Sequence, residues 1–306
     1  CGCKATRSCL LCEKEQINCL SKNDFFGKYI SYVYCPYCNQ IFKGWNTDEV
    51  INEHALGHNN VDGLNFNGIY IMNNFLSEEE ECSLMKGIDE MQWDLSQSGR
   101  RKQNFGPKVN FKKKRIKTGN FKGFPEFSKF VQYKFKSVPI LKTFQSIEQC
   151  SLEYEPSRGA QIDPHIDDCW VWGERIVTVN CLSDTTLTLT KYKANGNKRY
   201  NLEFVECYKN KLMMREKSTQ FEDEDNVVIR IPLQRRSLIV LFGDARYSWE
   251  HRILREDITE RRVCLAYREF TPSFLLGGEE YNKSAEIFKN SKFFWNHEEA
   301  QLNESK

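Results

Sequence analysis

Apolar and polar residues alternate in short runs through the middle and the end of this 306-residue chain. Alternation with a period of two is typical of β-strands that bury one face. The pattern predicts a short strand at 68–72, and further strands at 149–154, 175–182, 185–192, 227–231, 237–242 and 262–270. Turn residues separate most of these runs, so the chain favours a fold made of many short strands.

Helical patterns come before most of the strands. Ser77, followed three residues later by Glu80, is a capping box, which predicts a helix running from there to about Met91. A second short helix is expected at 127–135. Short strands preceded by helices indicate an α+β protein that is mainly β, built as a double-stranded β-helix (a jelly roll) with helices packed on one sheet.

Composition divides the chain into three regions. We expect a Cys/His-rich N-terminal region at 1–60, a jelly-roll domain at 61–275, and a C-terminal helix and tail at 276–306. Within the jelly roll, 193–226 is first Lys-rich and then acidic, which indicates a long hairpin or partly ordered insertion with solvated charges. The C-terminal helix is expected at 279–295, with an apolar side made of Phe288, Phe293 and Phe294.

The net charge of +2 gives no overall attraction for polyanions. No apolar run reaches the length of a membrane span, and no signal peptide is visible, so we expect an intracellular protein of the cytoplasm and nucleus. The chain opens with Cys1, which leaves open whether a targeting segment precedes it. Its oligomeric state cannot be deduced from these features.

The first 38 residues hold seven of the 13 cysteines. For a chain without a visible signal, this favours metal binding over disulfides. Cys35 and Cys38, followed by His54 and His58, approximate the spacing of a Cys2His2 zinc site. The two histidines are four residues apart and would share one face of a helix, although a pair of surface histidines would have the same spacing.

Four cysteines at the start of the chain form a second candidate zinc site, a tetrathiolate: Cys1, Cys3, Cys9 and Cys12. The loop between them is short, and Cys19 is an alternative ligand. Zinc would hold this region folded, because about 60 residues with few large apolar side chains bury little surface.

Two histidines and an aspartate later in the chain point to iron chemistry. His165 and Asp167 are two residues apart and would face the same side of a strand, while His251 follows the apolar run 237–242. Two imidazoles and one carboxylate can hold Fe(II) on one face and leave the other positions open. His-x-Asp alone is common by chance, so the next motif matters.

Arg262 and Arg268 are six residues apart on one predicted strand and would share a face. A buried apolar strand has no evident need of two guanidinium groups unless they have an anionic partner. A dicarboxylate such as 2-oxoglutarate would supply that partner. The ligand set and the arginines together predict an enzyme that uses Fe(II), 2-oxoglutarate and O2.

These motifs resemble the AlkB branch of the Fe(II)/2-oxoglutarate dioxygenases, and the N-terminal cysteines are similar to those of the group of the fourth animal homologue. The resemblance implies iron ligation by His165, Asp167 and His251. It also implies that Arg262 pairs with the distal carboxylate of the cosubstrate, that Arg268 contacts the metal-proximal end, and that Tyr154 donates a hydrogen bond to it. The segment 97–106 resembles part of the family's substrate lid, with the residues Arg100, Arg101, Lys102 and Phe105.

The segment 100–117 is strongly basic and has no acidic residue. Phe105 and Phe111 lie between its charges, so it could contact the phosphates and bases of DNA. An acidic protein surface or plain solvation fits the same pattern. The cations are Arg100, Arg101, Lys102, Lys108, Lys112, Lys113, Lys114, Arg115 and Lys117.

The chain departs from the DNA-repair members of the family at two positions. Cys169 replaces an acidic residue that reads the damaged base, and Leu152 replaces an asparagine ahead of Tyr154. Trp170 and Trp172 follow, and a tryptophan can bind a methylated cation, although structural tryptophans are more common.

For the substrate, the resemblance implies demethylation of monomethyl-lysine in a protein, with actin as the associated target. N6-methyladenine in DNA is the alternative. An alternative of another class is a non-catalytic zinc-bearing adaptor, which the intact His165, Asp167 and His251 set argues against.

Overall fold

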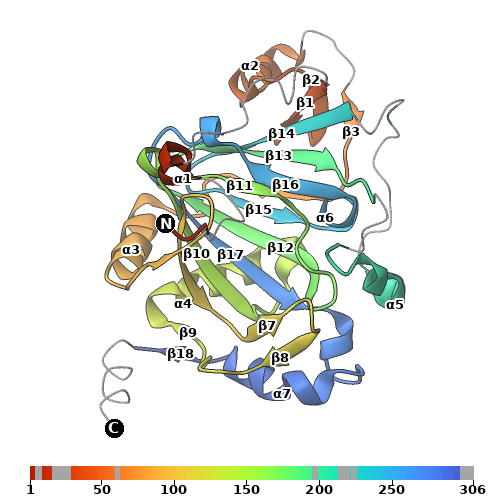
Figure 1. Cartoon of the computed structure of the whole chain (residues 1–306). Coiled ribbons are helices and arrows are strands. Elements are labelled where there is room, and N and C mark those ends of the chain that lie inside the picture. The colour runs from red at the N-terminus through yellow and green to blue at the C-terminus, as the bar shows by residue number, and fades with distance from the viewer. Residues whose placement is uncertain are drawn as a thin grey trace.

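The structure is a computed structural model that describes residues 1–3, 9–15, 29–58, 63–194, 199–212, 221 and 226–296. Two seven-stranded sheets are layered over a shared apolar core (Figure 1). Sheet I has the order β11 (Ile162–His165), β16 (Trp249–Ile253), β13 (Thr185–Lys191), β14 (Val227–Leu233), β1 (Ile30–Cys35), β2 (Gln40–Lys43) and β3 (Leu64–Asn65).

Sheet II forms the second layer. Its order is β4 (Ile69–Met72), β15 (Leu238–Leu241), β12 (Trp172–Cys181), β17 (Arg262–Phe270), β10 (Glu148–Tyr154), β6 (Arg101–Phe105) and β5 (Asp94–Leu95). Two short pairs are added, β7 (Lys108–Asn110) with β8 (Arg115–Lys117) and β9 (Phe124–Pro125) with β18 (Phe294–Trp295). The strand pairs within both large sheets are antiparallel, except β1 with β14, and this arrangement is consistent with the predicted double-stranded β-helix.

The helices are short. They are α1 (Leu10–Glu15), α2 (Thr47–Glu53), α3 (Glu78–Asp89), α4 (Lys129–Lys134), α5 (Val205–Tyr208), α6 (Gly243–Tyr247) and α7 (Tyr281–Asn290). Ser77 caps α3 with the predicted capping box, in which the Glu80 side chain accepts from the Ser77 backbone. Within the described residues, no helix combines the length and the apolar character needed to cross a membrane.

Alternate side chains of β17 point to opposite faces of sheet II, and the two sets differ in polarity. Val263, Leu265 and Tyr267 belong to the apolar cluster that also contains α3 and α4 side chains, so this face is covered by the helices. Arg262 and Arg268 have the opposite parity and therefore point toward the interior between the sheets. The strand thus buries an apolar face and still delivers two cations to the other side.

The predicted strands from 68–72 to 262–270, and the helices near 77–91 and 127–135, are confirmed in place and type. The prediction at the C-terminus is wrong in extent. Helix α7 ends at Asn290, after which Phe294 enters the short strand β18 and Phe293 is exposed. Phe288 still packs against the core as predicted.

Two further expectations need correction. Residues 1–60 are not a structurally separate region, because β1 pairs with β14 in the middle of sheet I. The domain limits at 60 and 275 stay predictions. For 193–226 the sequence left a long hairpin or a partly ordered insertion open; its described part contains short helical turns, among them α5, which do not fit the hairpin, and the acidic run 222–225 lies outside the described residues.

Glu153 is a buried charge in sheet II that three arginines neutralise. Its carboxylate accepts hydrogen bonds from Arg101, Arg158 and Arg261, with nitrogen–oxygen distances of 2.7, 2.6 and 2.9 Å. Burial alone would raise the pKa of Glu153, but the arginines outweigh burial and lower it to about 2. A carboxyl group whose pKa is lowered by folding stabilises the folded state above its unfolded pKa, and this contribution disappears as the pH falls toward the folded pKa.

We predict that Glu153→Gln lowers the free energy of unfolding by about 2–3 kcal/mol at pH 7, because three half-buried arginines lose the buried anion that they share. Urea denaturation at pH 7 and pH 4 measures this. The difference from the unmodified protein should shrink at pH 4, and Glu90→Gln, at an exposed position on the end of α3, should change little. An equal loss at both pH values would contradict the charge argument.

Candidate active site

The two histidines of the predicted iron site are direct cross-strand partners. His165 is the last residue of β11 and pairs with His251 in β16, and their ring centroids are 4.1 Å apart. The register slips between Ile162 and His165, and Pro164 lies in that interval. Because proline cannot donate to the ladder, a bulge here is expected, and bulges re-aim the side chains that follow them.

Asp167 completes the cluster from just beyond β11. The prediction that it lies on the same strand as His165 is wrong, because β11 ends at His165. Its side chain nevertheless converges: Oδ2 is 3.7 Å from His251 Nε2, and one ligand atom from each of the three residues lies within 4.8 Å of the others. Asp168 turns away, as predicted, and accepts from Asn201 instead.

The protonation states of the three side chains in this cluster suit metal binding. His165 Nδ1 lies 2.8 Å from the Asp163 carbonyl oxygen, which can only accept, so Nδ1 carries the proton and Nε2 is free. Burial lowers the pKa of His165 and, more strongly, that of His251, so both imidazoles are neutral. Burial would raise the pKa of Asp167, but nearby positive charge, chiefly that of Arg268, outweighs burial and lowers it.

One atom of the cluster lacks a partner. Asp167 Oδ2 is buried and has no hydrogen-bond partner in the described part of the chain, whereas Oδ1 accepts from Arg268 at 2.8 Å. An ionised oxygen left alone in this way is costly unless a cation binds it. The donor set, its protonation and the orphaned oxygen all fit a divalent iron ion held by His165, Asp167 and His251.

The two arginines of β17 have different partners, and Arg268 is the one that contacts this cluster. Arg268 donates to Glu148 at 2.5 Å as well as to Asp167, and therefore orients an iron ligand. Arg262 is 2% exposed and donates through Nε to Asn180 at 2.6 Å. Its Nη1 is buried without a partner among the described residues, so the guanidinium still has a donor for an anion.

Tyr154 pairs with Arg262 across β10 and β17, and the Arg262 guanidinium lies 4.8 Å from its ring centroid. Arg100 approaches the same ring at 5.9 Å. Burial raises the pKa of Tyr154, so the phenol keeps its proton and can donate to a carboxylate. Two predicted cosubstrate residues, Tyr154 and Arg262, thus lie together, and the third, Arg268, contacts the predicted iron ligand Asp167.

Similar proteins agree with this geometry. The mouse protein named alpha-ketoglutarate-dependent dioxygenase alkB homolog 4 is 36% identical over 300 residues, which cover 96% of this chain and 94% of that protein. The human protein of the same name is 36% identical over 295 residues, covering 94% of this chain and 92% of that protein.

The chain belongs to the AlkB family of 2-oxoglutarate-dependent dioxygenases.

A Caenorhabditis elegans protein described as a DNA N6-methyl adenine demethylase is 33% identical over 303 residues, covering 94% of this chain and 93% of that protein. No family model matches the chain. This AlkB homologue is therefore a 2-oxoglutarate-dependent dioxygenase, of the group of the fourth homologue.

Three features near the candidate site of this AlkB homologue, two residues and one segment, were missing from the sequence predictions. Glu148 and Asn180 fix the two arginines, and neither has a motif of its own. The third is a strap, residues 199–212, that joins the segments after Asp167 and before His251. Within the strap, Tyr200 donates to Glu250 at 2.5 Å. The structure, not the sequence, marks the strap: its consecutive residues Tyr200 and Asn201 both have a positive φ, and such strain clusters at functional sites.

Of the two interpretations of Trp170 and Trp172, the structure supports the structural one. Trp170 is 4% exposed and packs edge-on against Phe274, with ring centroids 5.2 Å apart. Trp172 is also buried, and its nearby cation is Arg268, 6.0 Å from the ring centroid. Both tryptophans are core side chains here, so neither offers a free face to a methylated lysine.

The predicted lid residues are part of an ordered strand. Arg101, Lys102 and Phe105 lie in β6, which pairs with β10, and Arg101 is committed to Glu153. The rest of the basic segment forms the β7–β8 hairpin, whose cations are exposed. The tip of that hairpin contacts the strap, since Asn201 donates to the Phe111 carbonyl at 3.4 Å and Lys114 lies 5.2 Å from the Phe204 ring centroid.

Cys35, Cys38, His54 and His58 also converge. The helix α2 ends at Glu53, so the prediction that both histidines share one helix is wrong: His54 lies in a following 3-10 turn, and His58 has a positive φ. Cys35 Sγ is 3.6 Å from His54 Nδ1, and Cys38 Sγ is 3.6 Å from His58 Nε2. Tetrahedral zinc would set about 3.5 Å between sulfur and nitrogen, so the geometry matches.

We predict that Arg262→Lys raises the KM for 2-oxoglutarate by ~10–100-fold with little change in iron affinity, since a lysine cannot reproduce the paired donors of a guanidinium. Succinate formation against cosubstrate concentration measures it. The matched control is Arg235→Lys, because Arg235 pairs with Glu81 on α3 and should leave KM unchanged. An unchanged KM in Arg262→Lys would remove this residue from cosubstrate binding.

Proposed function

We propose that this AlkB homologue is an Fe(II)- and 2-oxoglutarate-dependent oxidative N-demethylase. The observation that carries the proposal is the cluster of His165, Asp167 and His251, with Arg268 bonded to Asp167 and an unsatisfied Nη1 of Arg262 on the same strand. Bound iron with 2-oxoglutarate supplies the activation of O2 that hydroxylates an N-methyl group, which then leaves as formaldehyde. The intact ligand set and the paired arginines speak against a non-catalytic adaptor.

The chain's own residues prepare that chemistry. Neutral His165 and His251 offer lone pairs, and Arg268 keeps Asp167 ionised and oriented. Arg262 and Tyr154 bind the distal carboxylate of the cosubstrate, and Arg268 lies at the metal-proximal end. Because these groups are buried between two sheets, their fields are screened little by water.

For the substrate we favour monomethyl-lysine in a protein, with actin as the expected target. Cys169 at the position of the base-reading acidic residue supports this choice, because it removes a group that DNA-repair members of the family use. N6-methyladenine in DNA is the second candidate. The exposed cations of the β7–β8 hairpin support it, as does the similarity to the nematode DNA N6-methyl adenine demethylase.

We also infer that zinc is bound by Cys35, Cys38, His54 and His58. The apolar cluster under this site is small, consisting of Val33, Cys35, Phe42 and Val50 with Cys38 packed against it. A bound ion would therefore supply much of the local folding energy. The cytoplasm and nucleus remain the expected compartments.

We expect anaerobic protein with Fe(II) and 2-oxoglutarate to show a weak visible charge-transfer band. His165→Ala should abolish the band and uncoupled succinate formation, because the iron loses a ligand. Asp168→Asn is the matched control, since Asp168 adjoins the cluster but faces Asn201, and it should keep the band. A band that survives in His165→Ala would refute the ligand assignment.

The substrate is decided by formaldehyde release. We expect turnover of monomethyl-lysine actin to exceed that of an N6-methyladenine oligonucleotide, with unmethylated actin and DNA as controls. Turnover of the oligonucleotide with inert actin would show that the first choice is wrong, and the DNA reaction would take its place.

A further inference from the structure

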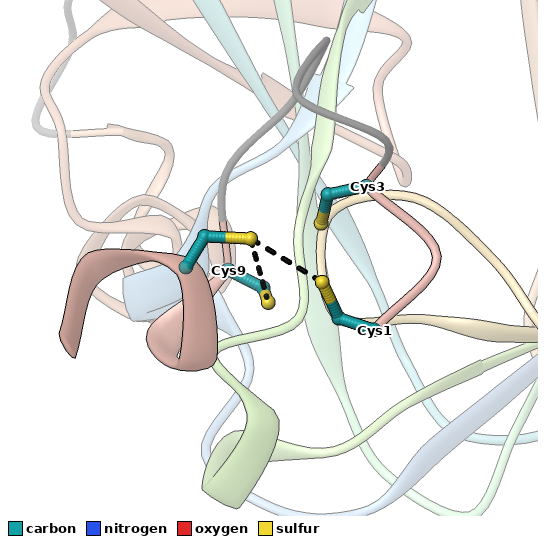
Figure 2. Close-up of side chains that lie close together, drawn as sticks. Cys1, Cys3 and Cys9 are labelled. Carbon is teal, nitrogen blue, oxygen red and sulfur yellow. Dashed lines mark hydrogen bonds between the residues drawn. The ribbon is translucent and has the colours of Figure 1, made fainter. Parts of the chain in front are cut away.

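We infer that Cys1, Cys3, Cys9 and Cys12 form a tetrathiolate zinc site that holds the path of the chain between Tyr154 and His165. The four Sγ atoms lie within 4.8 Å of one another, and Cys3 and Cys9 are buried. Figure 2 shows the thiols of Cys1, Cys3 and Cys9 turned toward a common centre. Cys19 lies outside the described residues.

The sulfur spacing favours one tetrahedral ion. Cys12 Sγ is 3.3 Å from Cys1 Sγ and 3.7 Å from Cys9 Sγ, and all four cysteines are free of disulfides. Tetrahedral zinc–thiolate bonds of about 2.3 Å would set the sulfurs about 3.8 Å apart. An iron–sulfur cluster places several irons and sulfides between its thiolates and needs a wider ring of cysteines.

The described N-terminal residues, 1–3 and 9–15, include a very short helix. Helix α1 has six residues, none of them buried, and a helix this short is unstable alone. Its main polar anchor is Glu13, which accepts from Arg255 at 2.7 and 2.8 Å. Buried thiols gathered without a supporting apolar core are typical of a structural metal site.

The two pairs of cysteines in the cluster lie beside residues that pack against different parts of the catalytic domain. Gly2, between the first two cysteines, is so close to the Ser96 backbone that an added Cβ would lie 2.5 Å from its oxygen. Leu10, between the other two, meets Gly159, where an added Cβ would lie 2.5 Å from Leu10 Cγ. An ion at the centre would therefore join the turn at 96–100 to the turn at Gly159.

Both turns belong to or contact the connection that leads to the predicted iron site. Gly159 lies between Tyr154 and His165, and its φ of 60° favours glycine. The turn at 96–100 holds the same connection through three hydrogen bonds: Ser98 to Asp163 at 2.8 Å, Gln161 to Ser98 at 3.0 Å, and Arg158 to Gly99 at 2.9 Å. The ion would thus brace the connection from the cosubstrate tyrosine to the first iron histidine.

This inference rests on the proposed function only for its effect on cosubstrate binding, so metal content is measured independently. Zinc per full-length chain should be two equivalents for the reduced protein, and one for either Cys12→Ser or Cys38→Ser. The exposed cysteines Cys82 and Cys207 provide the controls, and Cys82→Ser and Cys207→Ser should keep two. Cobalt exchanged into Cys38→Ser should show the intense charge-transfer band of four thiolates.

Cosubstrate affinity is the second measurement. Cys12→Ser should weaken 2-oxoglutarate binding to the anaerobic iron protein on the order of tenfold, as changes behind a ligand shell typically do, while Cys82→Ser does not. Two zinc equivalents in Cys12→Ser, or thiols that stay blocked to alkylation after chelation because they are disulfides, would overturn the metal site. Zinc lost with unchanged affinity would overturn the bracing role. Zinc bound as expected in a protein without succinate formation would count against the dioxygenase proposal alone.

Discussion

The pairing of β11 with β16 is the constraint on which the site depends. It places His165 opposite His251, two residues from distant parts of the chain, at a ring-centroid separation of 4.1 Å. Bringing such segments together has an entropic cost that local sequence cannot offset. The remainder of sheet I and the apolar core shared by both sheets provide the compensating burial.

Some buried charges have all the partners they need, and others keep an atom without a partner. This difference distinguishes a structural ion pair from a binding site. The Glu153 carboxylate forms ion pairs with three arginines, which is a stabilising arrangement. Asp167 and Arg262 each keep one buried polar atom without a partner in the described chain. The two groups carry opposite charges, so the site is complementary to a cation and an anion at once, as an iron ion and a dicarboxylate require.

The strand pattern was enough to predict most of the fold and the polarity of β17, because alternation forces Arg262 and Arg268 to one face. The pattern could not predict that Glu148 and Asn180 bond the two arginines, because these hydrogen bonds form only once the strands pair in the sheet. It also placed His54 and His58 on one helix, because spacing alone cannot reveal that α2 ends at Glu53. In the same way, the sequence left open whether Trp170 binds a cation or packs in the core, and only tertiary packing shows that it is buried against Phe274.

The parallel pairing of β1 with β14 has a consequence for any shortened form of the protein. Without β1, the backbone amide and carbonyl groups of β14 that now pair with Ile30–Val33 would face solvent as an open strand edge. Such edges recruit other chains and promote aggregation, whereas the native sheet ends in β3, a strand of two residues that offers little to pair with. The hairpin of β1 and β2, which carries Cys35, therefore covers the edge of β14. A catalytic fragment that begins after this hairpin would be prone to self-association.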